Sequence, residues 1–366
     1  MSDRSTSMSR SGDSGPIPGP AGTLDPNGDP AGAAGSPGPA AHRATPRPTV
    51  GHALADWLHW HRPLLATAAL TAAIAVFCVV GLIVDERTVT NAPVWLKPLK
   101  FSVSFALYTL SLAWMLSLSS RARRTGWWAG TAVAAAVVVE MVLLLIQVVR
   151  GRRSHFNQET PFDETIWSLM GNTIVVLWVA SLVVAVLLLR SPLTDRAGAW
   201  ALRLGSLIAL GGAALGFLMT LPTAEQDEAA ARGEEPTTVG GHSVGVPDGG
   251  PSMPLTDWST TGGDLRIPHF VGMHALQLLP LFAFALVLLA GRLPRLRDET
   301  VGVRLVITVA AGYAGLVALT TWQALRGQPL TEPDGATLGT LAALIAATAA
   351  GVWFSLRGRS ARRSTV

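Results

Sequence analysis

The chain is short of residues on which many protein classes depend. It contains one cysteine, Cys78, so no disulfide bond, cysteine-ligated zinc site or iron–sulfur cluster can form within one chain. Charged residues make up only 14% of the sequence, whereas soluble domains usually carry about 25%. The net charge is +4 and the arginines cluster beside apolar segments, so no nucleic-acid-binding surface is predicted.

The missing charges leave long apolar segments. Uninterrupted stretches of about 18 or more apolar residues are typical of membrane spans, not of buried cores. The sequence therefore predicts an all-α, polytopic membrane protein that lies in a lipid bilayer. The expected spans are at about 64–84, 96–119, 127–149, 166–190, 200–221, 268–290, 302–323 and 336–355.

The regions outside the spans differ sharply in composition. Gly, Pro, Ser and Ala dominate the N-terminal tail, which cannot bury enough apolar surface to fold. Trp57 and Trp60 favour the headgroup region of a bilayer. The predicted organisation is a disordered tail at 1–48, an interfacial segment at 49–63, a membrane domain at 64–357 with a long loop at 222–267, and a basic tail at 358–366.

Basic loops predict how the chain crosses the membrane. Arginines follow the second, fourth, sixth and eighth spans, and positively charged loops usually face the cytoplasm. Both termini are therefore expected in the cytoplasm, in a cell-membrane protein. The loop at 150–157 is an exception, because it places three arginines on the outer side. The cytoplasmic arginines are Arg121, Arg123, Arg124, Arg190, Arg196, Arg292, Arg295, Arg297, Arg357, Arg359, Arg362 and Arg363.

Two spans begin with similar segments. Pro98-Leu-Lys-Phe101 opens the second span and Pro268-His-Phe270 opens the sixth. This similarity suggests a repeat of four spans followed by four, on a match of only a few residues. No inverted repeat is evident.

Polar residues within the spans gather in the outer half. Glu140 lies roughly 14 Å inside the end of the third span at a rise of 1.5 Å per residue, close to the middle of a ~30 Å hydrocarbon core. Gln147 is two turns further out, and Arg150 is at the mouth. His274 and Gln277 share one face of the sixth span at depths of roughly 9 and 13 Å. A buried ionisable residue in a membrane is costly and usually marks function, although a structural pair is the competing explanation for Glu140.

Lysine is nearly absent as well. The sequence has 28 Lys and Arg residues, of which only Lys97 and Lys100 are lysines, both at the outer end of the second span. Lysine offers a compact charge with a pKa that can shift, so an anion-binding or proton-handling role is predicted. Asn172 in the fourth span is expected at a depth similar to that of Lys100. The inner halves of the third and sixth spans carry almost no polar side chains, so the predicted polar funnel ends blind near Glu140.

Histidines supply the candidates for a metal site. His155, His242, His269 and His274 all lie on the outer side, and neutral imidazole is a common metal ligand. His269 and His274 are five residues apart, which does not place them on one helical face as an i, i+4 pair would. A divalent metal is therefore a possible cofactor on this pattern. Haem has less support, because only His274 lies within the membrane.

These observations give one set of site residues. The predicted catalytic residues are Glu140, His155 and His274, and the predicted metal ligands are His269 and His274. The predicted ligand-binding residues are Lys97, Lys100, Gln147, Arg150, Asn157, Asn172, Gln277 and Asp264. The segment at 241–245 matches Gly-x-Ser-x-Gly, but the following Pro-Asp-Gly-Gly-Pro cannot start the helix that a hydrolase elbow needs.

Four functional interpretations remain open from the sequence. The first is an outward-facing pocket that binds or processes a small anionic or lipid-like ligand, with or without the help of a metal. The second is a secondary transporter that uses Glu140 for coupling. The third is a redox subunit linked to haem or quinone, and the fourth is a non-catalytic assembly or sensor protein. Whether the protein is an enzyme, and its oligomeric state, are left open by the sequence.

Overall fold

The computed structural model describes residues 57, 59–119, 122–193 and 195–357. All of them belong to the unit Thr49–Val366. The predicted disordered tail at 1–48, most of the predicted interfacial segment at 49–63 and the predicted basic tail at 358–366 lie outside the described residues.

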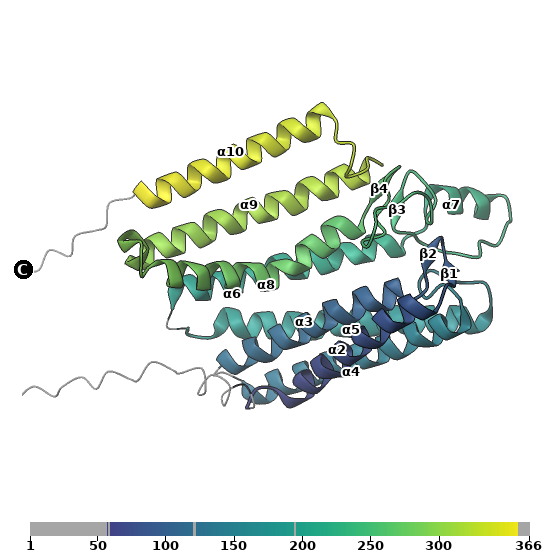
Figure 1. The fold of residues 1–366 in the computed structure, drawn as a ribbon, viewed down its shortest axis with the longest axis horizontal. Helices are drawn as coiled ribbons and strands as arrows, with labels where there is room; N and C mark the ends of the chain where they lie inside the picture. The colour runs from purple at the N-terminus through teal and green to yellow at the C-terminus, as the bar shows by residue number, and fades with distance from the viewer. Residues whose placement is uncertain (1–56, 58, 120–121, 194, 358–366) are drawn as a thin grey trace, which may run out of the picture. The chain divides into compact units, whose positions relative to one another are not determined.

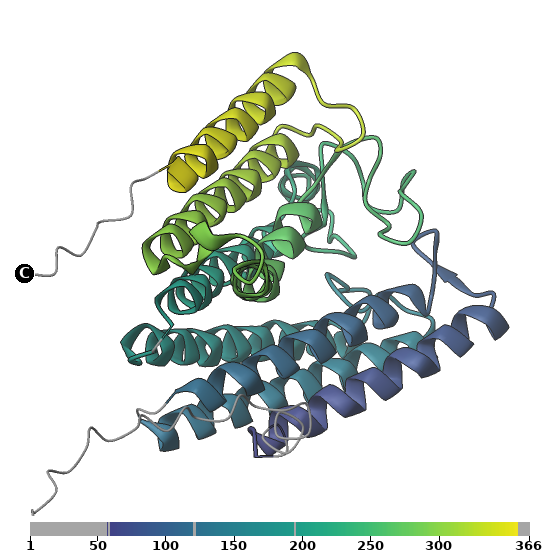
Figure 2. The ribbon, with the colours of Figure 1, turned by 60° about the vertical axis from the view of Figure 1, so that its left-hand side comes forward.

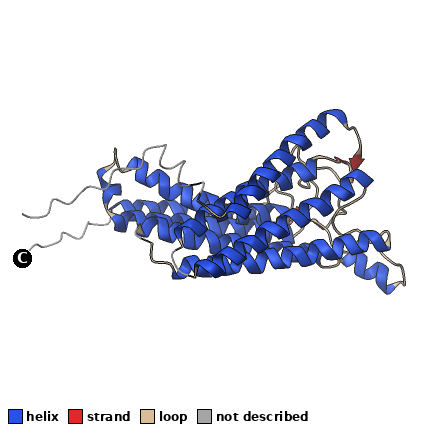
Figure 3. Ribbon diagram, turned by 90° about the horizontal axis from the view of Figure 1, so that it is seen from below, coloured by secondary structure: helices blue, strands red, loops and turns tan. Residues whose placement is uncertain are grey.

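Eight helices in the described residues are long and apolar enough to cross a membrane, which confirms the predicted polytopic helical fold (Figures 1 and 3). The fourth begins earlier than expected, at Pro161, because Thr160 caps it by accepting a hydrogen bond from the backbone N–H of Asp163. The helices are α2 (Arg62–Val84), α3 (Leu96–Leu118), α4 (Arg123–Arg150), α5 (Pro161–Arg190), α6 (Arg196–Ala214), α8 (Arg266–Leu289), α9 (Glu299–Leu325) and α10 (Gly335–Arg357).

Most of the short strands and short helices lie on the side where the first, third, fifth and seventh connections between these eight helices are found (Figure 1). We call this side the loop end, made of residues 85–95, 151–160, 215–265 and 326–334, and the other side the opposite end. Two antiparallel ribbons form there, and the acidic part of the long loop folds as a short helix with a capping box. The short elements are β1 (Thr88–Val89), β2 (Ala92–Pro93), η1 (Leu215–Thr220), α7 (Ala224–Ala231), β3 (Ser243–Val244) and β4 (Gly263–Asp264) at the loop end, and η2 (Pro294–Arg297) at the opposite end.

The eight helices form two groups of four (Figure 2). We call α2–α5 the first half and α6, α8, α9 and α10 the second half. Within the first half, α2 packs on α3 and α4 packs on α5; within the second half, α6 packs on α8 and α9 packs on α10. Equivalent helices run in the same direction and make the same contacts, so the halves are a parallel repeat. This arrangement agrees with the four-plus-four repeat suggested by the proline segments.

The ends of α4 and α9 carry the sequence signature of this repeat. Residues 147–151 are Gln-Val-Val-Arg-Gly and residues 323–327 are Gln-Ala-Leu-Arg-Gly. Gly151 and Gly327 adopt the left-handed conformation, with φ of 66° and 71°. In both turns the N–H of the residue after the glycine bonds to the glutamine carbonyl, which is the Schellman arrangement that favours glycine.

The start of α3 also corresponds to the start of α8. Pro98 and Pro268 are each the third residue of their helix, and both are buried. Four residues later, Ser102 and Gly272 are buried as well. The helices of the second half approach very closely here, since a Cβ on Gly272 would lie 2.5 Å from the Cα of Gly212. One apolar core joins the first half to α6 and α8, and a second lies among α6, α8 and α9 with α10 packed against it.

Candidate functional site

Two joined cavities lie where the halves meet at the loop end. The inner cavity, of about 230 Å³, is lined by α3 and α5 of the first half and by α6, η1 and α8 of the second. The outer cavity, of about 680 Å³, lies among the loops and the first turn of α3. Five residues line both cavities and form what we call the junction: His155, Phe156, His242, Arg266 and Phe270.

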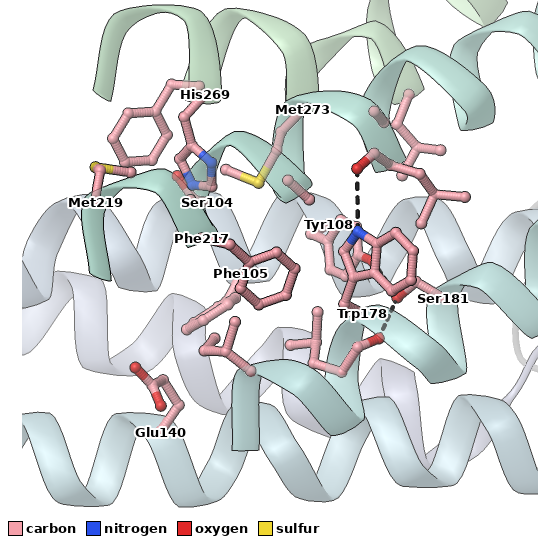
Figure 4. A pocket seen from close by; sticks show the side chains of 18 of the residues that line it. Ser104, Phe105, Tyr108, Glu140, Trp178, Ser181, Phe217, Met219, His269 and Met273 are labelled. Atoms are coloured by element: carbon pink, nitrogen blue, oxygen red, sulfur yellow. Dashed lines mark hydrogen bonds between the residues drawn. The ribbon is translucent and has the colours of Figure 1, made fainter. Parts of the chain in front are cut away.

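The inner cavity is long and mostly apolar (Figure 4). Its wall on α5 runs from Trp167 to Ala185, which is about 27 Å at the rise of an α-helix. In the part far from the junction, the Tyr108 hydroxyl lies 2.5 Å from the Ser181 hydroxyl and satisfies both groups. The cavity is therefore long enough for an extended apolar chain, and the Tyr108 and Ser181 hydroxyls far from the junction are paired with each other.

Glu140 is the most unusual residue of the inner cavity. Its side chain is fully buried, and neither carboxyl oxygen has a hydrogen-bond partner in the described part of the chain. It projects from α4 toward the cavity (Figure 4). An unpaired polar group in a buried position costs several kcal/mol, roughly 2–7 by transfer estimates, so a group from outside the chain is expected to satisfy it.

His155 is the polar side chain nearest to Glu140. Its Nε2 atom lies 3.8 Å from Oε1 of Glu140, too far for a hydrogen bond. Its Nδ1 atom lies 3.0 Å from the Ser154 hydroxyl, and its ring packs against Phe101 and Trp167. Burial, with Lys97 and His242 nearby, lowers the pKa of His155 well below its usual value. The imidazole is therefore neutral near pH 7 and faces Glu140 as a hydrogen-bonding group.

His242 joins the site from the long loop. Its Nδ1 atom donates to Oδ2 of Asp248 at 2.9 Å, and the backbone N–H groups of His242 and Ser243 donate to the same carboxylate. Burial lowers the pKa of His242, against the opposing effect of this hydrogen bond. Burial alone would raise the pKa of Asp248, but its bonds to His242 and Ser243 hold it well below the usual range. Nε2 of His242 is left to face the junction.

Arg266 fixes the junction from the first turn of α8. Its guanidinium binds both carboxylate oxygens of Asp264 and also reaches Asp257 and its backbone carbonyl. Asp264 is fully buried and accepts a further bond from the N–H of Ser259 at 2.8 Å. The long loop is thus tied to the start of a membrane helix by a charged cluster.

The outer cavity carries positive charges that have no partner. In the described residues neither the ammonium of Lys97 nor the guanidinium of Arg153 makes a hydrogen bond or ion pair, and both line this cavity. Lys97 is close enough to interact electrostatically with Glu140 and Asp248. Lys100 also lines the cavity and donates to the carbonyl of Thr256 at 2.8 Å. This set of cations is suited to an anionic group.

The structure therefore brings together part of the predicted set. Glu140, His155, His274 and Gln277 line the inner cavity, and Lys97 and Lys100 line the outer one. Oε1 of Gln277 is buried without a partner, as the oxygens of Glu140 are.

Gln147 and Arg150 lie elsewhere, in a closed network around Asp163. Nε2 of Gln147 and the guanidinium of Arg150 both donate to Oδ1 of Asp163, at 2.8 and 2.5 Å, and Thr160 donates to the other oxygen. Neither Gln147 nor Arg150 lines the inner or the outer cavity. Within the described residues, the side chains of Gln147 and Arg150 bond to each other and to Asp163. This network therefore stabilises the packing of α4 against α5.

Three other predicted ligand-binding residues also lie outside both cavity walls. Asn157 is buried and holds its own loop by bonding to the carbonyl of Arg153 and the N–H of Glu159. Asn172 is exposed on α5 and donates to the carbonyl of Ser168. Asp264 acts through Arg266, as described above.

The described residues contain no group of three or more His, Cys, Asp or Glu side chains placed to hold a metal. His269 and His274 both line the inner cavity, but they are 140° apart around α8 at 100° per residue. Nδ1 of His269 is taken by the carbonyl of Gly212 at 2.9 Å. The arrangement does not fit a divalent metal, and the haem or quinone interpretation stays a prediction.

Sequence reasoning missed several residues that shape the site. His242 was placed on the outer side, but its hydrogen bond to Asp248 was not predicted. Phe156 is an apolar loop residue, whereas Phe270 and Trp178 are apolar residues of membrane spans. An apolar residue in a span carries no signal that separates a cavity wall from a lipid-facing surface. No family model, curated protein or solved structure matches this chain.

Proposed function

We propose that the protein binds an anionic amphiphile, with the polar head in the outer cavity and the apolar chain in the inner cavity. The observation that carries this proposal is the junction, where five residues belong to both cavities. A polar space with unpaired Lys97 and Arg153 leads there into a long apolar space. Such a site matches the polar and apolar parts of one amphiphilic ligand. This ligand class is narrower than the small anionic or lipid-like ligand predicted from the sequence.

We place the loop end on the extracytoplasmic side, with both termini in the cytoplasm of a cell-membrane protein. The charge distribution supports this orientation. The connections predicted to be cytoplasmic carry twelve arginines, and short arginine-rich loops normally stay inside. Most loop-end arginines pair with nearby carboxylates, and Arg196 pairs with Glu299 at the opposite end. The loop-end pairs are Arg87–Asp85, Arg150–Asp163, Arg152–Glu159, Arg232–Glu234, Arg266–Asp264 and Arg326–Asp334.

Two glycines offer a matched test of chain binding. Gly171 lines the inner cavity, and a Cβ placed on it meets no atom within 4 Å. Gly211 has equally open space but does not line either cavity. Gly171→Phe should fill the inner cavity without a clash, whereas Gly211→Phe should leave it open.

The measurement is native mass spectrometry of the purified full chain after incubation with oleyl phosphate. We expect one bound molecule in the wild type and in Gly211→Phe, and strongly reduced occupancy in Gly171→Phe. Equal occupancy in all three proteins, or none in the wild type, contradicts the proposal.

A secondary transporter is the second candidate, and one observation favours it. The inner cavity lies between two parallel repeats, as substrate sites do in several transporter folds. Flux of a labelled anionic amphiphile across proteoliposomes, lost in Gly171→Phe, would select this candidate. Binding without flux would leave the binding protein or enzyme.

A further inference from the structure

The buried carboxyl group of Glu140 gives information about the ligand itself. Both oxygens lack partners within the described residues, although the side chain is fully buried and faces the inner cavity. Most buried polar groups in folded proteins are hydrogen-bonded, so this exception needs a partner that the chain does not supply. A carboxyl group accepts hydrogen bonds whether or not it is ionised, so a hydrogen-bond donor on the ligand is a suitable partner.

The gap between Glu140 and His155 is suited to one bridging atom. The 3.8 Å between Oε1 and Nε2 is too long for a direct bond, yet an oxygen placed beside both could lie at about 2.8 Å from each. A hydroxyl donates one hydrogen bond and accepts others. It could donate to Glu140 and accept from His155 when Ser154 donates to Nδ1 of that ring.

The repeat shows that the fold does not need a carboxyl group at this place. Glu140 lies two turns before Gln147 on α4, and Leu316 lies two turns before Gln323 on α9. The two glutamines occupy equivalent positions, so leucine is the counterpart of Glu140 in the second half. The polar side chain is therefore a feature of the site and not of the four-helix architecture.

The charges around the junction argue against an amine as the donor. Lys97 interacts electrostatically with Glu140 and makes no ion pair in the described residues. An ammonium group would be repelled by this cation, whereas a neutral hydroxyl would not. We propose that Glu140 and His155 form a subsite for a hydroxyl group of the bound amphiphile, next to its anionic head. This inference rests on the proposed function and names the ligand class as a hydroxylated anionic amphiphile.

Two probes separate the hydroxyl from the rest of the ligand. The 2-hydroxy derivative of oleyl phosphate has a phosphate, a free hydroxyl beside it and one chain, and it differs from oleyl phosphate by that hydroxyl alone. Their dissociation constants for the detergent-purified full chain give a preference ratio. We expect the wild type to prefer the hydroxylated probe about tenfold, the size expected for one net hydrogen bond.

Variants then assign the preference. Glu140→Leu introduces the residue of the second half, and His155→Phe keeps an aromatic ring against Phe101 and Trp167. Both should lower the ratio to near one, because each removes one of the two side chains that the hydroxyl would contact. Glu164→Leu is the matched control, because Glu164 is exposed on α5 and lines neither cavity. It should keep the wild-type ratio.

Each outcome bears on one claim. If the wild type binds both probes equally, or if Glu140→Leu and His155→Phe keep the preference, the hydroxyl subsite is wrong while the amphiphile site stands. If the wild type binds neither probe, the proposed function is wrong. The thermal midpoint checks folding: Glu140→Leu should unfold at the wild-type temperature or above it, because it removes an unpaired buried carboxyl group.

Discussion

Arg150 and Arg326 hold equivalent positions in the two halves, and each pairs with an aspartate at the start of the next helix. Arg150 reaches Asp163 in the first turn of α5, and Arg326 reaches Asp334 just before α10. The two joints differ in burial, since the side chain of Asp163 is fully buried whereas that of Asp334 is 37% exposed. The equivalent ion pair is therefore expected to contribute differently to the stability of the two halves.

The first prediction concerns these joints. Asp163→Asn should lower the free energy of unfolding by about 3 kcal/mol, because it leaves Arg150 without its buried partner. Asp334→Asn should have a clearly smaller effect, because water screens the exposed pair. Thermal unfolding of both variants in the same detergent gives the comparison. Equal destabilisation would contradict the unequal burial of the two joints.

Much of the fold was accessible from the sequence, because hydropathy reports directly on membrane spans. The span boundaries failed mainly at helix starts such as Pro161, where polar capping residues extend the helix beyond its apolar part. The repeat was also readable in the Gln-x-x-Arg-Gly segments at 147–151 and 323–327. Its significance becomes clear only when both glycines are seen to end equivalent helices.

The candidate site was less accessible, for a physical reason. A polar residue at depth in a membrane helix can face a cavity or a partner on the next helix, and its position along the helix is the same in both cases. Glu140 and Gln147 share one face of α4, yet the first faces a cavity and the second faces Asp163. The distinction depends on Asp163, a residue that reads from sequence as an ordinary helix-start residue.

The second prediction concerns pH. His155 and His242 are neutral in the folded protein because their pKa values are lowered, while the unfolded chain binds protons at about pH 6.5. The unfolded state thus binds more protons as the pH falls below 6.5, and stability is lost in that direction. Each histidine should contribute up to about 1.4 kcal/mol per pH unit. The titratable groups nearest to His155 are Glu140, Lys97 and His242.

Unfolding temperatures between pH 8 and pH 5 test this dependence. The wild type should lose stability mainly below pH 6.5, and His155→Phe should show a shallower decline. An unchanged pH profile in His155→Phe would show that this ring does not titrate on unfolding.

The third prediction concerns the outer cavity. Lys97→Gln should weaken the binding of oleyl phosphate about tenfold, because its unpaired charge is free to bind the head group. Arg152→Gln is the control: Arg152 lines the same cavity but is half exposed and already paired with Glu159. Its loss should change affinity much less. Titrations at two salt concentrations should show the stronger salt dependence in the wild type than in Lys97→Gln.

The fourth prediction concerns orientation. The native Cys78 is buried and should react poorly with a membrane-impermeant maleimide. A cysteine at the exposed Glu228 in α7 should be labelled on intact cells, whereas one at the exposed Arg295 should be labelled only after permeabilisation. The reverse pattern would place the loop end in the cytoplasm and move the site to the other leaflet.

The most direct test of the account locates the bound chain within the protein. An alkyl phosphate with a photoreactive group at the end of its chain would be bound to the full protein in lipid nanodiscs and cross-linked. The account predicts labelling on the inner-cavity wall far from the junction, near Met115 and Val184, which excess oleyl phosphate suppresses. Labelling confined to exposed apolar positions such as Ile83 and Val139, unaffected by the competitor, would contradict it.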